Sequence, residues 1–122
     1  MGRTRYVGTG EVIFGHAGDI LESTPLGSCI AVCVYDSRLG VGGMAHVMLP
    51  GEAPENESEK NKYAVNAVEA LSYGMLQMGC EAASIDVCLI GAANVLDISD
   101  DTISRKNLDS VLNALREKNL KI

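Results

Sequence analysis

Three short apolar runs, each bounded by turn residues, constrain the fold of this chain more than any other feature. They cover residues 29–35, 41–49 and 84–90. Runs of about four to eight apolar residues with many β-branched side chains are typical of buried strands. The segment Asp36–Gly40 joins the first two runs and has the composition of a tight turn. These two strands are therefore expected to pair antiparallel. Earlier β segments are expected within residues 6–14 and at 20–21.

Two amphipathic helices are expected in the second half of the chain, after a polar, acidic segment that reads as a mobile surface loop (residues 51–62). The first covers residues 63–78 and ends at Gly79, a residue typical of helix C-termini. The second covers residues 104–118, with Asp100 and Asp101 near its positive N-terminal end. Strands that come first, followed by strand–helix alternation, favour an α/β fold of the layered α+β type. We expect a mixed β-sheet with two principal helices packed on it. Residues 120–122 resemble the start of another strand.

Length and charge exclude several classes of protein. The chain has 122 residues, of which 47% are hydrophobic, and this is typical of one globular domain. Ten basic against sixteen acidic side chains give a net charge of −6, which argues against nucleic acid as a partner. No apolar run approaches the roughly 18–20 residues that a membrane helix needs, so no membrane insertion is expected. The N-terminal residues have no apolar core typical of a signal peptide, and we expect a cytoplasmic protein.

Neither a disulfide nor a metal site is expected from the cysteines and histidines. No CxxC motif occurs, the histidines are not spaced as a helical pair, and cytosolic disulfides are uncommon. Cys33 and Cys88 are interpreted as core residues and Cys80 as partly exposed. His16 is interpreted as a solvent-facing residue in a turn.

Cys29 and His46 are the candidate chemical groups. Cys29 follows a Gly-Ser bend and opens an apolar strand, and His46 lies near the end of the next strand. If the two strands are neighbours, the thiol and the imidazole can approach each other. A thiol next to an imidazole is the smallest set of groups that thiol acyl transfer requires. An imidazolium would favour the thiolate, and the same ring could protonate a leaving amine. The alternative is that both are ordinary core residues.

Segments 26–36 (LGSCIAVCVYD) and 41–50 (VGGMAHVMLP) resemble the CheD family of chemoreceptor glutamine deamidases. The resemblance continues at residues 62–64, 90–94 and 103–107, and so covers nearly all of the chain. It implies hydrolysis of selected glutamine side chains in methyl-accepting chemoreceptors, which gives glutamate and ammonia. Such a reaction needs no metal and no organic cofactor.

The resemblance also implies the site residues. It assigns Cys29 as the nucleophile and His46 as its partner, and it places Ser23 where the family has a threonine. A serine keeps the hydroxyl but has a looser rotamer. Thr24 is the counterpart if the loop is shifted by one residue.

This sequence departs from the family at two points. Ala92 stands where the family tends to have a glycine. Family members also continue past the second helix, so residues 1–122 are expected to be a single CheD-like deamidase domain that is C-terminally truncated or a minimal variant.

Two other functions are compatible with the sequence. The chain could be a non-catalytic module that docks to chemoreceptors or to a CheC-type phosphatase. It could also be a different Cys–His hydrolase, such as a peptidase. Release of ammonia without backbone cleavage separates a deamidase from a peptidase.

Overall fold

The computed structural model describes residues 2–23, 29–91 and 102–122, with side chains from residue 105 onward in the last range. The strands are β1 (Thr4–Val7), β2 (Val12–His16), β3 (Ile20–Ser23), β4 (Ile30–Asp36), β5 (Val41–Val47) and β6 (Asp86–Ile90). The helices are α1 (Ala64–Gln77) and α3 (Thr102–Glu117), with short 3-10 turns at Lys60–Lys62 and Ala82–Ser84. The expectations for Asp100, Asp101 and Ala92 lie outside the described residues.

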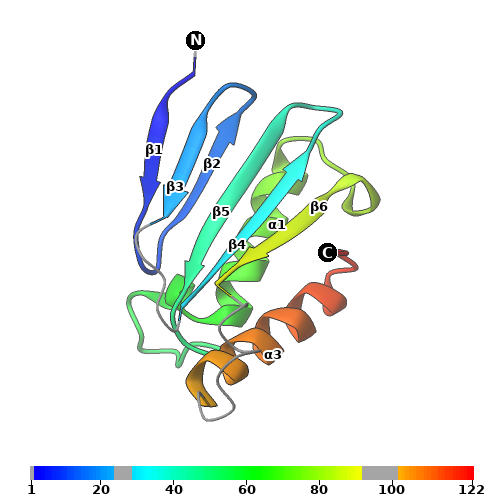
Figure 1. Cartoon of the computed structure of the whole chain (residues 1–122). Helices are drawn as coiled ribbons and strands as arrows, with labels where there is room; N and C mark the ends of the chain where they lie inside the picture. The colour runs from blue at the N-terminus through cyan, green and yellow to red at the C-terminus, as the bar shows by residue number, and fades with distance from the viewer. Residues whose placement is uncertain (1, 24–28, 92–101) are drawn as a thin grey trace.

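The strands form two sheets (Figure 1). A four-stranded antiparallel sheet has the order β2-β5-β4-β6, and β4 pairs with β5 as the short turn between them predicts. A second sheet consists of β1 and β3, which run parallel with Val7 opposite Ser23. The predicted α+β class is confirmed, and among the pairs of named strands the parallel one is that of the smaller sheet. Lys121 forms a parallel bridge to Asp86 of β6, at the place where a further strand was expected to begin.

The two faces of the four-stranded sheet are covered by different elements. Side chains alternate along a strand, so Ile30 and Val34 of β4 point to one side and Ala31 to the other. The first side packs against α1 and α3, where Leu71 and Leu115 belong to the same buried cluster. Ala31 belongs to a second cluster with Val7 and Met44, in which the partly buried Ile13, Leu21 and Cys33 also pack. The strand β4 is therefore buried from both sides, between the helices and the small sheet.

Both helices lie close to their predicted positions. The amide of Gly79, which has a positive φ of 93°, donates to the carbonyl of Leu76 at 3.0 Å and so helps to close α1. Along α3, Val111 and Leu115 are almost fully buried, as their spacing of one helical turn predicts. No helix among the described residues has the length and apolar character needed to cross a membrane.

The interpretation of two cysteines was wrong. Cys80 is only 4% exposed, because Gly79 turns the chain back and the Cys80 amide donates to the Met75 carbonyl. Cys88 is exposed, because β6 is an edge strand and places this side chain on the face away from the helices. Cys33 is half-buried. His16 is exposed as predicted, but it is the last residue of β2 and does not lie in the turn that follows.

Gly74 gives a test of the packing between α1 and β2. A Cβ atom at this position would overlap the ring of Phe14. Alanine is favoured over glycine in a helix by roughly 1 kcal/mol, but overpacking costs about 1–3 kcal/mol. We expect Gly74→Ala to lower the free energy of unfolding, measured by urea titration. In a Phe14→Leu background the same substitution should be neutral or stabilising. Destabilisation of equal size in both backgrounds would contradict this account.

Candidate functional site

His46 is a buried histidine on the central strand β5. It is 1% exposed and lies directly opposite Ala31 of β4, so both side chains are on the face covered by the small sheet. Cys29 immediately precedes β4. Continuing the alternation of β4 by one residue puts Cys29 on this same face, because it is two residues from Ala31.

The strand register brings Cys29 and His46 to diagonal positions. With Ala31 opposite His46, the residue opposite Cys29 would be Met48, two residues beyond His46. Such diagonal neighbours in an antiparallel sheet have Cα atoms about 7–8 Å apart, with their Cβ atoms somewhat closer. An imidazole is long enough to bridge most of this separation. The backbone pairing is therefore compatible with the predicted neighbourhood of thiol and imidazole, which stays a prediction.

The backbone around His46 is held from both directions. Its carbonyl accepts a hydrogen bond from the Gly10 amide at 3.0 Å, and its amide donates to the Glu11 carbonyl at 3.3 Å. Just after β5, the Met48 carbonyl accepts a hydrogen bond from Nδ2 of Asn107 at 3.1 Å. One turn further along α3, the Ser110 hydroxyl accepts from the Gly51 amide at 2.7 Å. The helix α3 thus anchors the segment that leaves the site.

Asn107 was missed as a candidate site residue. It is fully buried, and it sits one helical turn before Val111 on the apolar stripe of α3. A polar side chain on the buried stripe of a helix needs a hydrogen-bonding partner, and this is the signal that could have identified it. Its role is positioning, because it contacts the backbone two residues beyond His46.

Ser23 lies at the same end of the molecule as Cys29 and His46. It is the last residue of β3 and pairs with Val7, which packs against Ala31 and Met44 of the large sheet. The turn after Val7 contains the Gly10 and Glu11 groups that bond to the backbone of His46. The side chain of Ser23 is partly buried. The alternative Thr24 lies outside the described residues.

Burial raises the pKa of the Cys29 thiol above its ordinary value. This is opposite to the shift that an imidazolium partner was expected to cause. Desolvation penalises the thiolate, so the thiol form is favoured in the substrate-free protein. A reaction at Cys29 would therefore require a base that removes the thiol proton during the attack.

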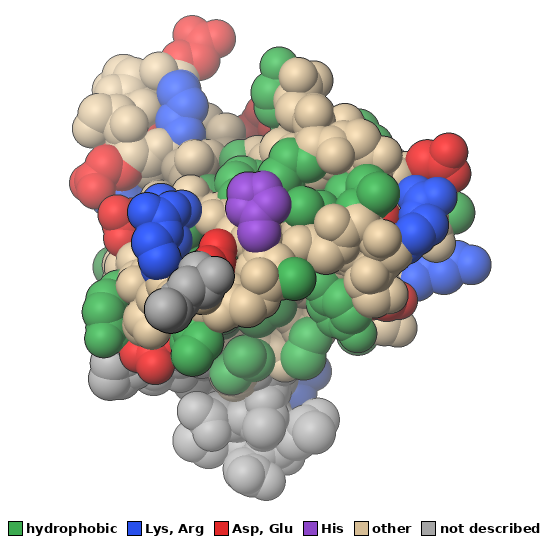
Figure 2. All heavy atoms as spheres, turned by 90° about the horizontal axis from the view of Figure 1, so that it is seen from above, with side chains coloured by type: hydrophobic (Ala, Val, Ile, Leu, Met, Phe, Trp, Pro, Cys, Tyr) green, Lys and Arg blue, Asp and Glu red, His purple; other side chains and the backbone are tan. Residues whose placement is uncertain are grey.

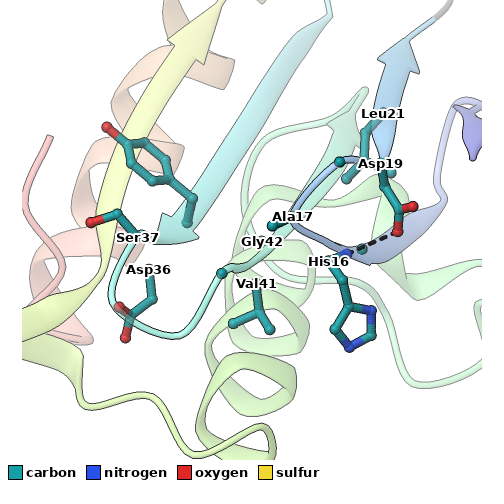
Figure 3. A pocket seen from close by; sticks show the side chains of 12 residues that line it. His16, Ala17, Asp19, Leu21, Asp36, Ser37, Val41 and Gly42 are labelled. Atoms are coloured by element: carbon teal, nitrogen blue, oxygen red, sulfur yellow. Dashed lines mark hydrogen bonds between the residues drawn. The ribbon is translucent and has the colours of Figure 1, made fainter. Parts of the chain in front are cut away.

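The pocket near the other end of the sheet is not part of this arrangement. A cavity of about 250 Å³ lies between the turn that joins β4 to β5 and the turn that joins β2 to β3. In Figure 3, Asp36 and Ser37 lie on one side and Asp19 and Leu21 on the other. The lining residues that the structure describes include no cysteine. Figure 2 shows the molecule from above. Basic and acidic side chains lie next to one another at the two sides of this face, and hydrophobic side chains lie between the two sides.

No group of three or more His, Cys, Asp or Glu side chains in the described part of the chain is arranged to hold a metal ion. The candidate chemistry consists of a thiol, an imidazole and a hydroxyl at one end of the sheet.

Comparison with known proteins identifies the family of this chain. Residues 48–122 match the family model described as CheD chemotactic sensory transduction. A probable chemoreceptor glutamine deamidase CheD of Chlorobium luteolum is 48% identical over 115 residues, which cover 93% of this chain and 57% of the relative. The chemoreceptor glutamine deamidase CheD of Thermotoga maritima is 30% identical over 118 residues, which cover 97% of this chain and 74% of the relative. For a Burkholderia thailandensis relative the identity is 39%, and 48% of its length is covered. The chain thus spans about half the length of several relatives, and it belongs to the CheD family.

Proposed function

We propose that residues 1–122 form a protein-glutamine deamidase domain that acts on selected glutamines of methyl-accepting chemoreceptors in the cytoplasm. The observation that carries the proposal is the register of β4 and β5, in which Ala31 lies opposite His46. Continued by one residue to Cys29, this register would bring Cys29 and His46 to diagonal positions on one face. The relatives from Chlorobium luteolum and Thermotoga maritima carry this activity in their names. Cys29 is half-buried and His46 is buried.

The reaction proceeds in two steps through a thioester. As Sγ of Cys29 attacks the carbonyl carbon of the glutamine side chain, His46 takes the thiol proton. The tetrahedral oxyanion collapses, and His46 returns the proton to the departing ammonia. His46 then takes a proton from water, whose oxygen attacks the thioester, and the thiol leaves with that proton. The products are glutamate, ammonia and the original thiol. The hydroxyl of Ser23 serves to orient the imidazole.

The surroundings of the thiol suit a protein substrate. Ile90 lies opposite Ala31 on the other side of β4 and is 47% exposed, and Met48 is 42% exposed. Met48 directly follows β5 and Ile90 ends β6, so the two apolar side chains approach the candidate site from the two strands that flank β4. An open surface with exposed apolar groups fits a macromolecule that docks across it better than a small molecule that needs enclosure.

The raised pKa of Cys29 predicts how the alkylation rate of this thiol depends on pH. Because burial raises the pKa in the folded state, the thiolate fraction at neutral pH is lower than in the unfolded chain. We expect alkylation of Cys29 by iodoacetamide to reach half its maximal rate at a higher pH in the folded protein than in urea. Peptide mapping at a series of pH values measures both curves. A folded-state midpoint below that in urea would show a standing thiolate–imidazolium pair and contradict this account.

Substitution of the two central residues tests the reaction itself. Cys29→Ala should abolish deamidation, and His46→Asn should slow it by at least about a hundredfold, because the ring transfers protons in both steps. The control Cys33→Ala should keep most of the activity. Intact mass of a receptor fragment, which rises by about one unit per converted glutamine, measures turnover.

Three outcomes would overturn these assignments. A folded Cys29→Ala protein that still deamidates excludes this thiol as the nucleophile. A His46→Asn protein within tenfold of wild type makes His46 a core residue. A wild-type chain that binds receptor or a CheC-type phosphatase without turnover favours the docking module.

Ser23 is tested by comparing three variants. If its hydroxyl orients His46, Ser23→Ala should lower the rate by roughly three- to twelvefold, the value of one hydrogen bond of about 0.5–1.5 kcal/mol. Ser23→Thr should keep or raise the rate, because a β-branched side chain restricts its hydroxyl to fewer rotamers. Thr24→Ala is the matched control. Should Thr24→Ala be the damaging change instead, the orienting hydroxyl belongs to Thr24.

A further inference from the structure

Cys33 and Cys88 face each other across two neighbouring strands. They are register partners in the antiparallel pair β4–β6, so both side chains project from the same face of the sheet. Cys33 is half-buried and Cys88 is exposed. Neither takes part in the proposed deamidation. We propose that the two thiols are a reversible redox site, which a peroxide converts into a cross-strand disulfide.

The backbone geometry of an antiparallel pair permits this bond. Directly opposed residues have Cα atoms about 4.5–5.5 Å apart, within the range of about 4.4–6.8 Å that a disulfide spans. Their Cβ atoms lie about 4.5–5.5 Å apart, whereas a disulfide prefers about 3.8 Å. Closing the bond therefore draws the strands together and strains them slightly. Strained and exposed disulfides are the readily reduced ones, which makes the site reversible.

The different burial of the two thiols sets the order of the steps. Cys88 is the exposed partner and meets the oxidant first. Burial, together with the neighbouring Cys88 thiol, raises the pKa of Cys33 to about 11, which makes Cys33 the slower thiol toward a reagent in solution. The fixed position of Cys33 opposite Cys88 offsets this low reactivity, because the second step is intramolecular.

The reaction balances with one peroxide molecule. Sγ of Cys88 attacks a peroxide oxygen, the O–O bond breaks, and the product is a sulfenic acid and one water. Sγ of Cys33 then attacks Sγ of Cys88, the S–O bond breaks, and the hydroxyl leaves as water with the proton of Cys33. Two thiols are oxidised to a disulfide while one peroxide is reduced to two waters.

The other two cysteines are excluded by position. Cys80 is buried on the side of the sheet that packs against the helices. Cys29 lies four residues before Cys33 along the same strand direction, a separation on the order of 13 Å, which no disulfide spans. The bond would thus tie the edge strand β6 to β4 and leave the Cys29 thiol untouched.

Peptide mapping of the oxidised chain tests the proposal. The reduced, full chain is treated with equimolar hydrogen peroxide, blocked with N-ethylmaleimide and digested without reduction. We expect a linked Cys33–Cys88 peptide, a loss of about two mass units from the unblocked chain, and full reversal by dithiothreitol. The linked peptide should be at least about tenfold more abundant than any other disulfide, because only this pair is held together.

Matched variants identify the pair. Cys33→Ser and Cys88→Ser should each lose the link, and in Cys33→Ser the exposed Cys88 should proceed through sulfenic acid to sulfinic acid when a second equivalent of peroxide is added. Cys29→Ser and Cys80→Ala should keep it. A principal product that contains Cys29, a disulfide-linked dimer through Cys88, or overoxidised Cys88 with no link in the wild-type chain would each overturn the proposal.

Discussion

The antiparallel register between β4 and β5 is the constraint on which the rest of the structure depends. A slip of one residue would move His46 to the helix side and expose the apolar side chains that now form the core. The turn between the strands sets this register. Oδ1 of Asp36 accepts from the amides of Arg38 and Leu39, the Gly40 amide donates to the Asp36 carbonyl, and Gly40 adopts a positive φ of 68°. A glycine takes this conformation without steric cost, so the turn fixes the strand pairing at little expense in free energy.

The layers on both sides of the four-stranded sheet explain why the candidate site has a buried imidazole and a half-buried thiol. The helices cover one face, and the small sheet of β1 and β3 covers the other over β5. His46 is central on β5 and is therefore enclosed, whereas Cys29 lies at the entrance to β4, where the covering sheet ends. The same enclosure raises the pKa of the Cys29 thiol. The proposed removal of the thiol proton by His46 during the attack agrees with this environment.

Helix α3 contributes to the site through the backbone rather than through a reacting group. A fully buried amide side chain must be hydrogen-bonded, and Asn107 meets this need by donating to the Met48 carbonyl. Ser110 holds the same segment at Gly51. The two contacts join residues that are 59 positions apart in the sequence. They set the path of the chain at the point where it leaves β5.

The amino-acid sequence by itself determined the elements and the most local pairing. The period of the apolar residues indicated both helices, and the short turn after Asp36 predicted that β4 and β5 pair antiparallel. The parallel pairing of β1 with β3, the exposure of Cys88 and the burial of Cys80 were decided only by the tertiary structure. The tertiary structure alone also decided that Cys33 lies opposite Cys88, because their strands are far apart in the sequence. The physical reason is that local patterns report periodicity and turn geometry, whereas burial and long-range register depend on which layers pack together.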